Sequence, residues 1–130
     1  WLPPGETKTS MLGLMRAGML AGPFRFGLGP LSRLMGLLNK FEQLHERDMP
    51  DRHWHLFILG VDPPRQGQGL GSSLIAPVLA RADADGLPCY LETTKAKNVV
   101  FYKKHGFEVL VEDDTSDGRL HYWTMKRAAR

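Results

Sequence analysis

Apolar positions in the first third of the chain recur at helical spacing. Met11, Met15 and Met19 lie four residues apart and define one helical stripe. A second stripe, in a helix predicted from Pro30 to about His45, consists of Leu31, Leu34, Leu38, Phe41 and Leu44 or His45. We predict two amphipathic helices packed on a core. A methionine-lined lid over an apolar substrate and an interfacial membrane helix are the alternatives.

The pattern from His53 onward changes to short apolar strands separated by helices. The predicted elements, in chain order, are strand 53–61, a helix that continues to about Ala84, strand 89–94, helix 95–106, strand 107–113 and strand 119–127. The turn-rich DTSDG between the last two strands predicts a hairpin. This order predicts an α/β fold, in which helices cover a mixed sheet.

Composition and charge narrow the class of protein. The 130 residues are 42% hydrophobic and 24% charged, which is typical of one soluble globular domain. The net charge of +3 is scattered along the chain, so a nucleic-acid partner is not indicated. Arginines and prolines interrupt the apolar segment 11–38, which excludes a membrane span. The single cysteine, Cys89, is expected to be a buried structural thiol and suits a cytoplasmic location.

A glycine-rich turn lies between strand 53–61 and the following helix. In VDPPRQGQGLGSSL (61–74), Gly67, Gly69 and Gly71 occupy alternate positions before the helix. Backbone N–H groups at such a junction can bind an anion, because no Cβ blocks its approach and the helix dipole favours it. The turn therefore predicts a phosphate-binding site.

Two of the cofactors that such a turn can bind fit poorly. A dinucleotide turn runs from its strand almost directly into the first glycine, whereas residues 62–66 intervene here. Ser72 also stands where that pattern has its final glycine, although Glu92 lies at the distance that the pattern requires. A P-loop is excluded because no Gly-Lys-Ser/Thr follows.

A third interpretation fits both this turn and a second, downstream motif. Gln66, Gly69 and Gly71 form Gln-x-x-Gly-x-Gly, which resembles the acyl-CoA signature of the GCN5-related N-acetyltransferases (GNATs). The stretch LETTKAKNVVFYKKHGFEV resembles that family's second motif, in the positions Asn98, Tyr102, Gly106 and Phe107. The resemblance extends from about His53 to Met125, and especially to the puromycin N-acetyltransferase-like branch.

The resemblance implies a GNAT fold and a division of the chain. Residues 53–126 would form the acetyl-CoA-binding core, and residues 1–50 a helical region on the acceptor side. In that family a strand, one or two helices and at least one more strand precede the catalytic half. Trp1-Leu2-Pro3-Pro4 resembles the tail of one of those strands, so the chain is expected to lack the N-terminal part.

The resemblance also implies a cofactor site for acetyl-CoA. Its residues would be Leu59, Val61, Gln66, Gly67, Gln68, Gly69, Leu70, Gly71, Ser72, Asn98 and Tyr102. The pantetheine arm would lie between strands 53–61 and 89–93, with the N–H of Val61 polarising the thioester carbonyl. Asn98 would hold the pantetheine amide. Arg65 and Lys97 are either outer phosphate contacts or solvated charges.

The implied reaction is direct acetyl transfer to an amine in a ternary complex. Tyr102 would protonate the departing thiolate; its alternative role is a core tyrosine beside Phe101 and Phe107. Glu92 would be the general base, directly or through water, or would have only a structural hydrogen bond.

The histidines offer further candidates. Those that could replace Glu92 as the base are His45, His53, His55 and His121. His53 and His55 share one strand face, but without a third ligand at suitable spacing we expect no metal. His105, at a helix end, is expected to be a cation that interacts with the helix dipole.

The predicted function is an N-acetyltransferase that acts on a primary amine of a small molecule, with an antibiotic-like amine among the options. The alternatives are a non-catalytic or truncated CoA-binding module, a protein N-acetyltransferase and a dinucleotide-dependent oxidoreductase. The fold sets the donor and not the acceptor, so the sequence leaves the amine open, as it does a homodimer.

Overall fold

A computed structural model describes residues 1–5 and 28–130 of the chain, which form two compact units. One unit contains α3 (Leu28–Asp48), which confirms the helix predicted from Pro30 to about His45 and extends it at both ends. The predicted stripe of Met11, Met15 and Met19 lies outside the described residues. In the part of the chain that is described, no helix has the length and apolar character needed to cross a membrane.

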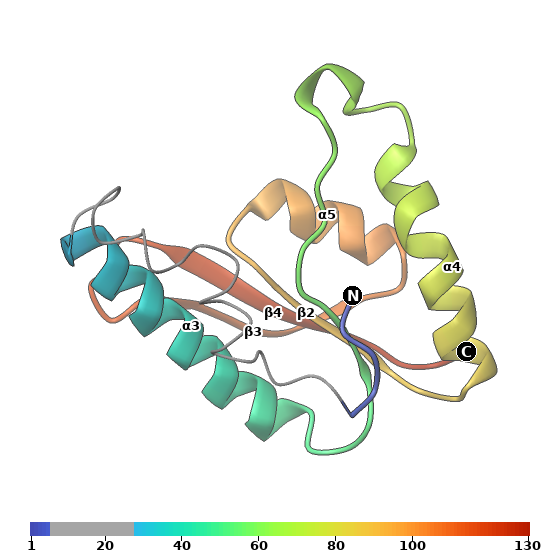
Figure 1. The fold of residues 1–130 in the computed structure, drawn as a ribbon, viewed down its shortest axis with the longest axis horizontal. Coiled ribbons are helices and arrows are strands. Elements are labelled where there is room, and N and C mark those ends of the chain that lie inside the picture. Colours follow the sequence, from blue (N-terminus) through green and yellow to red (C-terminus); the bar gives the residue numbers. More distant parts are fainter. Residues whose placement is uncertain (6–27) are drawn as a thin grey trace. The chain divides into compact units, whose positions relative to one another are not determined.

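The second unit is built on a mixed four-stranded sheet (Figure 1). Its strands are β1 (Trp54–Leu56), β2 (Cys89–Thr93), β3 (Glu108–Asp114) and β4 (His121–Arg127), in the order β1-β2-β4-β3. β1 runs parallel to β2, and the other neighbours are antiparallel. On the other side of β1, Leu2 forms an antiparallel bridge with His55. The predicted mixed sheet and the β3–β4 hairpin are confirmed.

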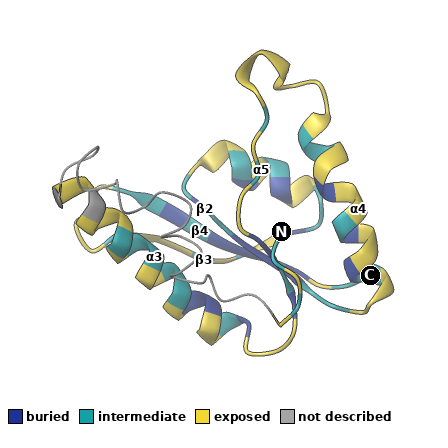
Figure 2. Ribbon diagram, viewed as in Figure 1, coloured by how far each residue is buried: buried dark blue, intermediate teal, exposed yellow. Residues whose placement is uncertain are grey.

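Two helices, α4 (Leu70–Ala84) and α5 (Ala96–Lys104), pack on one face of this sheet. The core that joins them consists of Leu56, Ile75, Leu79, Ala82, Cys89, Leu91, Val99, Tyr102, Phe107 and Met125. Figure 2 shows buried residues, in dark blue, along β2 and β4 and on parts of α4 and α5. The Cys89 side chain is fully buried in this core, and burial raises the pKa of its thiol to about 11. The expectation of a structural thiol is confirmed.

The first predicted strand is much shorter than the apolar run HWHLFILGV indicates. β1 ends at Leu56, which pairs with Leu91, whereas β2 continues to Thr93. Beyond this point the N–H groups of residues 58–61 have no acceptor in the described chain, although the Val61 carbonyl accepts a 3.0 Å hydrogen bond from Gln66 Nε2. The prediction of a strand over 53–61 was wrong after Leu56, because apolar character does not specify where strand pairing stops.

Candidate functional site

The turn between β1 and α4 needs glycine for different reasons at different positions. A short 3-10 helix, η2 (Pro63–Arg65), leads into Gly67 and Gly69, whose φ angles of +78° and +81° favour glycine strongly. Gly69 is the N-cap of α4. At Gly71 the requirement is space, because an added Cβ would lie 3.3 Å from the Phe101 ring.

The N–H groups from Gly67 to Ser72 form a continuous row of unpaired donors. Among the described residues, the first backbone N–H of α4 that has an acceptor is that of Ser73, which donates to the Gly69 carbonyl at 3.1 Å. For the six residues from Gly67 to Ser72, no acceptor is found among the described residues. These residues are exposed or half-buried at the N-terminus of a helix, where free N–H groups and the helix dipole favour negative charge, so the row is suited to an anion supplied from outside the chain.

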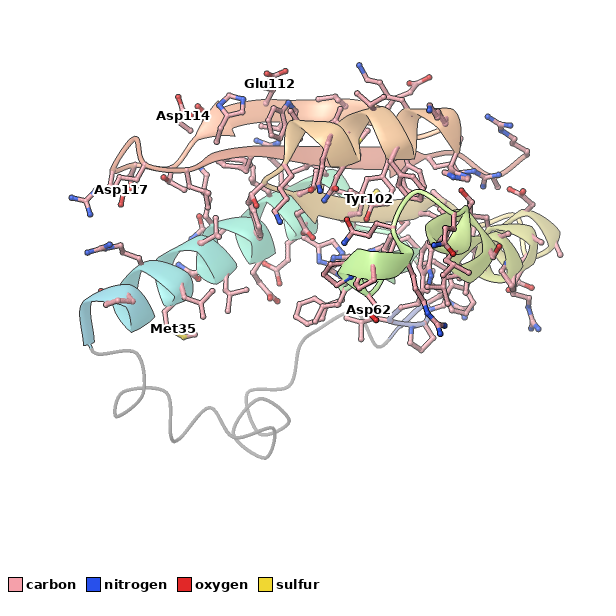
Figure 3. The ribbon with its side chains drawn as sticks, turned by 90° about the horizontal axis from the view of Figure 1, so that it is seen from above. Met35, Asp62, Tyr102, Glu112, Asp114 and Asp117 are labelled. Atoms are coloured by element: carbon pink, nitrogen blue, oxygen red, sulfur yellow. The ribbon has the colours of Figure 1, made fainter. Side chains whose placement is uncertain are left out.

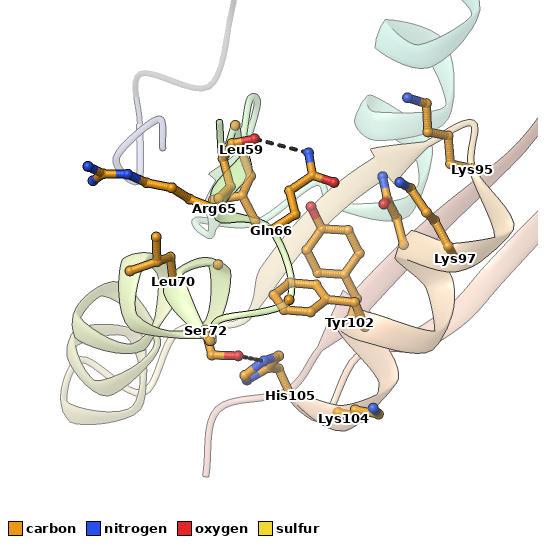
Figure 4. A pocket seen from close by; sticks show the side chains of 17 residues that line it. Leu59, Arg65, Gln66, Leu70, Ser72, Lys95, Lys97, Tyr102, Lys104 and His105 are labelled. Carbon is orange, nitrogen blue, oxygen red and sulfur yellow. Dashed lines mark hydrogen bonds between the residues drawn. The ribbon is translucent and has the colours of Figure 1, made fainter. Parts of the chain in front are cut away.

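The row of donors borders a cavity of about 580 Å³ (Figure 4). Segment 59–61, the N-terminal turn of α4 and one side of α5 form its walls. The predicted cofactor-binding residues all line it except Gln68, whose Nε2 instead donates to the Pro64 carbonyl at 3.4 Å. Two sequence-distant motifs thus meet in one cavity.

Tyr102 lies in this cavity and in the core at the same time. Its ring contacts those of Phe101 and Phe107, with centroids 5.1 and 5.7 Å away, and only 7% of the residue is exposed. Burial raises the pKa of the phenol above its ordinary value of 10. The hydroxyl therefore stays protonated at neutral pH and can donate a proton or a hydrogen bond.

Asn98 is held in the cavity wall by a buried hydroxyl. Its Nδ2 donates to Thr93 Oγ1 at 3.0 Å, and the backbone N–H of Lys95 approaches the same oxygen at 3.5 Å. Thr93 is buried at the end of β2, so it fixes the Asn98 side chain against the sheet. The Asn98 Oδ1 atom has no hydrogen-bond partner among the described residues and is available to a ligand amide.

His105 differs from the expectation of a cation at a helix end. The side chain lies beside Ser72, with Nε2 3.0 Å from Ser72 Oγ. Burial, followed by the charges of Arg127 and Lys104, lowers its pKa below 6.5. The lowered pKa argues against the expected cationic state, because partial burial and two nearby positive groups disfavour the imidazolium.

Several side chains that line the cavity were not predicted from the sequence. Lys95 and Lys104 line the cavity in addition to the predicted Arg65 and Lys97, and so does His105. The helical spacing of Lys97, Phe101 and Lys104 could have indicated this shared face of α5. Figure 4 shows Arg65 and Lys97 on opposite sides of Tyr102.

Glu92, the predicted base, does not line this cavity. Its neighbours Leu91 and Thr93 contact the core and α5, and side chains alternate along a strand, so Glu92 projects from the opposite face of β2. There its Oε2 lies 2.8 Å from His55 Nε2. The two residues form a paired acid and base on adjacent strands.

The other candidate histidines lie elsewhere. His121 contacts Asp114 at 2.7 Å and Glu112 at 3.1 Å; Figure 3 shows both acidic residues on β3, apart from Tyr102. His53 Nδ1 lies 2.6 Å from the Asp51 carbonyl oxygen. His45 is in α3, within the other unit. None of these three lines the described cavity.

Comparison with known proteins identifies the class. The family model described as an acetyltransferase (GNAT) domain matches residues 36–109, which include the glycine turn, Asn98, Tyr102 and Phe107. The chain belongs to the GNAT acetyltransferase family. This assignment rejects the dinucleotide interpretation of the glycines; the puromycin N-acetyltransferase-like branch stays a prediction.

Individual relatives support the same family. An uncharacterized N-acetyltransferase of Schizosaccharomyces pombe is 32% identical over 113 residues, which cover 82% of this chain and 45% of that protein. A mycothiol acetyltransferase of Salinispora tropica is 31% identical over 91 residues, which cover 67% of this chain and 29% of that protein. The chain thus spans less than half the length of these curated relatives.

A solved structure shows the fold over a shorter range. An acetyltransferase of Corynebacterium glutamicum, described as histone acetyltransferase HPA2 and related acetyltransferase, has a TM-score of 0.52 and 26% identity to this chain. The similarity covers 61% of this chain and 42% of that one. Together with the mixed sheet, it confirms the predicted GNAT fold class.

Proposed function

We propose that this chain is the acetyl-CoA-binding part of an N-acetyltransferase that acetylates a primary amine of a small molecule. The observation that carries the proposal is the row of unpaired N–H groups from Gly67 to Ser72 in the same cavity as the protonated hydroxyl of Tyr102. An anion-binding row and a proton donor are the two functions that a CoA thioester donor requires. Residues 53–126 form this core in the proposal, and residues 1–50 belong to the acceptor side.

The donors of the cavity fit successive parts of acetyl-CoA. The N–H groups from Gly67 to Ser72 bind the diphosphate, and Arg65 and Lys97 add positive charge at the cavity's edge. The unpaired N–H groups of residues 58–61 run beside the cavity, where an extended amide chain can pair with them as a strand would. Asn98 Oδ1 accepts from such an amide.

The acyl group that acetyl-CoA supplies is activated by residues at the inner end of the cavity. In the proposal the N–H of Val61 donates to the thioester carbonyl oxygen, where negative charge develops as the amine attacks. The C–N bond forms as the C–S bond breaks. Tyr102 transfers its proton to the departing sulfur, and burial keeps that proton on the phenol until it is needed.

The proton that the attacking amine loses goes to the opposite face of β2 in this proposal. Glu92 accepts it directly or through water, with His55 as its hydrogen-bond partner at 2.8 Å. Pairing between β1 and β2 stops beside Glu92, so groups from both faces can approach the thioester there. Donor and acceptor thus bind from opposite faces of the sheet.

The acceptor class is the finer part of the proposal. The Salinispora relative is named for mycothiol, which favours a small-molecule acceptor. The structural relative from Corynebacterium is described as a histone acetyltransferase and related acetyltransferase, which favours a protein amine as the competing acceptor. A direct comparison of small amines with peptide amines separates the two.

Ligand-dependent melting followed by thiol release tests the proposal. At one hundred times Kd a ligand stabilises a folded protein by about 2.7 kcal/mol, so acetyl-CoA and CoA should raise Tm by several degrees whereas NADH should not. Small primary amines should then release CoA thiol faster than peptides with free N-termini. Stabilisation without thiol release from any amine would favour the non-catalytic CoA-binding module, and stabilisation by NADH alone would contradict the proposal.

A further inference from the structure

The hydrogen bond between His105 and Ser72 joins the end of α5 to the first turn of α4. Ser72 contributes one of the unpaired N–H groups, and its hydroxyl lies 3.0 Å from His105 Nε2. The imidazole packs on Phe101, with ring centroids 4.8 Å apart, and Phe101 in turn lies against Gly71. His105 therefore contacts the last residue of the row of donors through its side chain. Ser72 and His105 both line the cavity (Figure 4).

The direction of this hydrogen bond depends on the protons of the imidazole. With hydrogen on Nδ1 alone, Nε2 accepts the Ser72 proton, and the serine then offers only lone pairs to the cavity. With hydrogen on Nε2, whether in the other neutral tautomer or in the imidazolium, His105 donates to Ser72 Oγ. The Ser72 hydroxyl proton is then available to an anion.

Positive groups surround His105 from two elements. Lys104 precedes it on α5, and Arg127 on β4 donates from Nε to the His105 carbonyl at 3.1 Å. Burial, and then both charges, lower the pKa of the imidazole in the free protein. A bound anion beside Ser72 acts in the opposite direction, because negative charge stabilises the imidazolium.

We propose that His105 is a positioning residue that turns the Ser72 hydroxyl into a donor for the diphosphate of CoA and couples this binding to the uptake of a proton. The inference rests on the proposed function, since it concerns the same anion site. The proposal predicts a higher affinity for the diphosphate at mildly acidic pH, because the imidazolium can only donate a hydrogen bond to Ser72. The thermodynamic linkage is reciprocal, so ligand binding must raise proton occupancy at His105.

Dephospho-CoA is the probe, because it keeps the diphosphate but lacks the phosphomonoester, whose own pKa near 6 would confuse the pH profile. Calorimetric titration of the full chain between pH 5.5 and 8 should show wild-type affinity rising roughly fivefold towards acid. Proton uptake on binding, measured in buffers of different ionisation enthalpy, should accompany the rise. His121→Gln removes a histidine that does not line the cavity and should preserve the whole profile.

Variants at the pair separate positioning from mere packing. His105→Gln keeps a side-chain N–H near the Nε2 position without titrating, so affinity should stay close to that of the wild type at pH 8 and lose its pH dependence. His105→Leu should bind several-fold more weakly at every pH. Adding Ser72→Ala to His105→Leu should weaken binding little further, because the two residues act as one unit.

The results that would overturn the role of His105 differ from those that would overturn the proposed function. A pH dependence that persists in His105→Gln, or wild-type affinity in His105→Leu, would overturn the role of His105 while leaving the acetyl-CoA site intact. Wild-type binding that is tight but flat with pH would do the same. Failure of the wild-type chain to bind dephospho-CoA, CoA or acetyl-CoA at any pH would instead overturn the proposed function, and this inference with it.

Discussion

Phe101 of α5 lies against Gly71, so its ring packs directly on the backbone of the first turn of α4. An added Cβ at Gly71 would approach the Phe101 ring to 3.3 Å, and Val61 Cγ2 to 3.9 Å. This contact holds the row of backbone donors next to the helix that bears Asn98 and Tyr102. The spacing of the two halves of the cavity is thus set by a glycine.

Replacing Gly71 by alanine tests that spacing. We expect Gly71→Ala to lower the free energy of unfolding by roughly 1 kcal/mol, because overpacking outweighs the gain in helix propensity. CoA affinity should fall as well, since α5 must move away from the donors. Gly60→Ala is the control for stability, because a Cβ there has no neighbour within 4 Å. Equal melting temperatures for both variants would contradict the proposed contact.

Removal of the Tyr102 hydroxyl separates chemistry from binding. Tyr102→Phe keeps the aromatic contacts with Phe101 and Phe107 but removes the proton donor. We expect kcat to fall about 100-fold or more while Tm and CoA affinity change little. Steady-state kinetics with a responsive amine and calorimetry with CoA measure the two effects. Unchanged kcat in a folded variant would exclude Tyr102 as the acid.

Thr93 should affect ligand affinity through its hydrogen bond to Asn98. Thr93→Val is close in shape but removes the oxygen that accepts from Asn98 Nδ2 at 3.0 Å. Loss of one hydrogen bond predicts an increase in KM for acetyl-CoA of about threefold to tenfold, with kcat nearly constant. Thr93→Ser retains the hydroxyl and should restore the wild-type KM. If Val and Ser behave alike, Thr93 does not orient Asn98.

The ion pair between Asp83 and Arg127 predicts the response of stability to acid. Arg127 Nη1 and Nη2 each donate to Asp83 at 2.7 Å, and this contact, with the Arg130 N–H, lowers the pKa of the carboxyl to about 2. A pKa below the unfolded value means that the pair stabilises the fold above about pH 4 and that this contribution disappears as pH falls towards 2.

Asparagine at position 83 should therefore flatten the acid limb of the stability curve. In Asp83→Asn, Tm should be lower than in the wild type at pH 7, and the difference should shrink between pH 4 and 2. Asp85→Asn, which breaks the more exposed pair with Arg81 on the same helix, should change Tm little at any pH. Parallel curves for wild type and Asp83→Asn would contradict the assigned pKa.

The sequence predicted elements and motifs well where local chemistry determines them. The glycine turn, the buried Cys89 and the hairpin of β3 and β4 follow from residue type and periodicity, and the structure contains all of them. The positions of Gly67 and Gly69 follow from the left-handed backbone that only glycine adopts readily. In these cases a few adjacent residues carry the whole signal.

Features that depend on long-range pairing could not be predicted in the same way. The end of β1 at Leu56 is set by its partner strand and not by the apolar residues that follow. The lowered pKa of His105 depends on burial and then on Arg127, which is distant in sequence. The face of β2 from which Glu92 projects could be assigned only once the contact of its neighbour Thr93 with Asn98 was known. Such facts arise only when the sheet and α5 are assembled.

The donors from Gly67 to Ser72 belong to the main chain, and this bears on how the protein can diverge. A substitution changes a side chain but leaves the N–H in place, and proline is the sole coded residue that deletes one. In the proposed function, side chains on the opposite face of β2 can therefore change and alter the acceptor, while the main-chain donors for the phosphates stay in place. In that function, substitutions can thus change the amine acceptor while the acetyl-CoA site is retained.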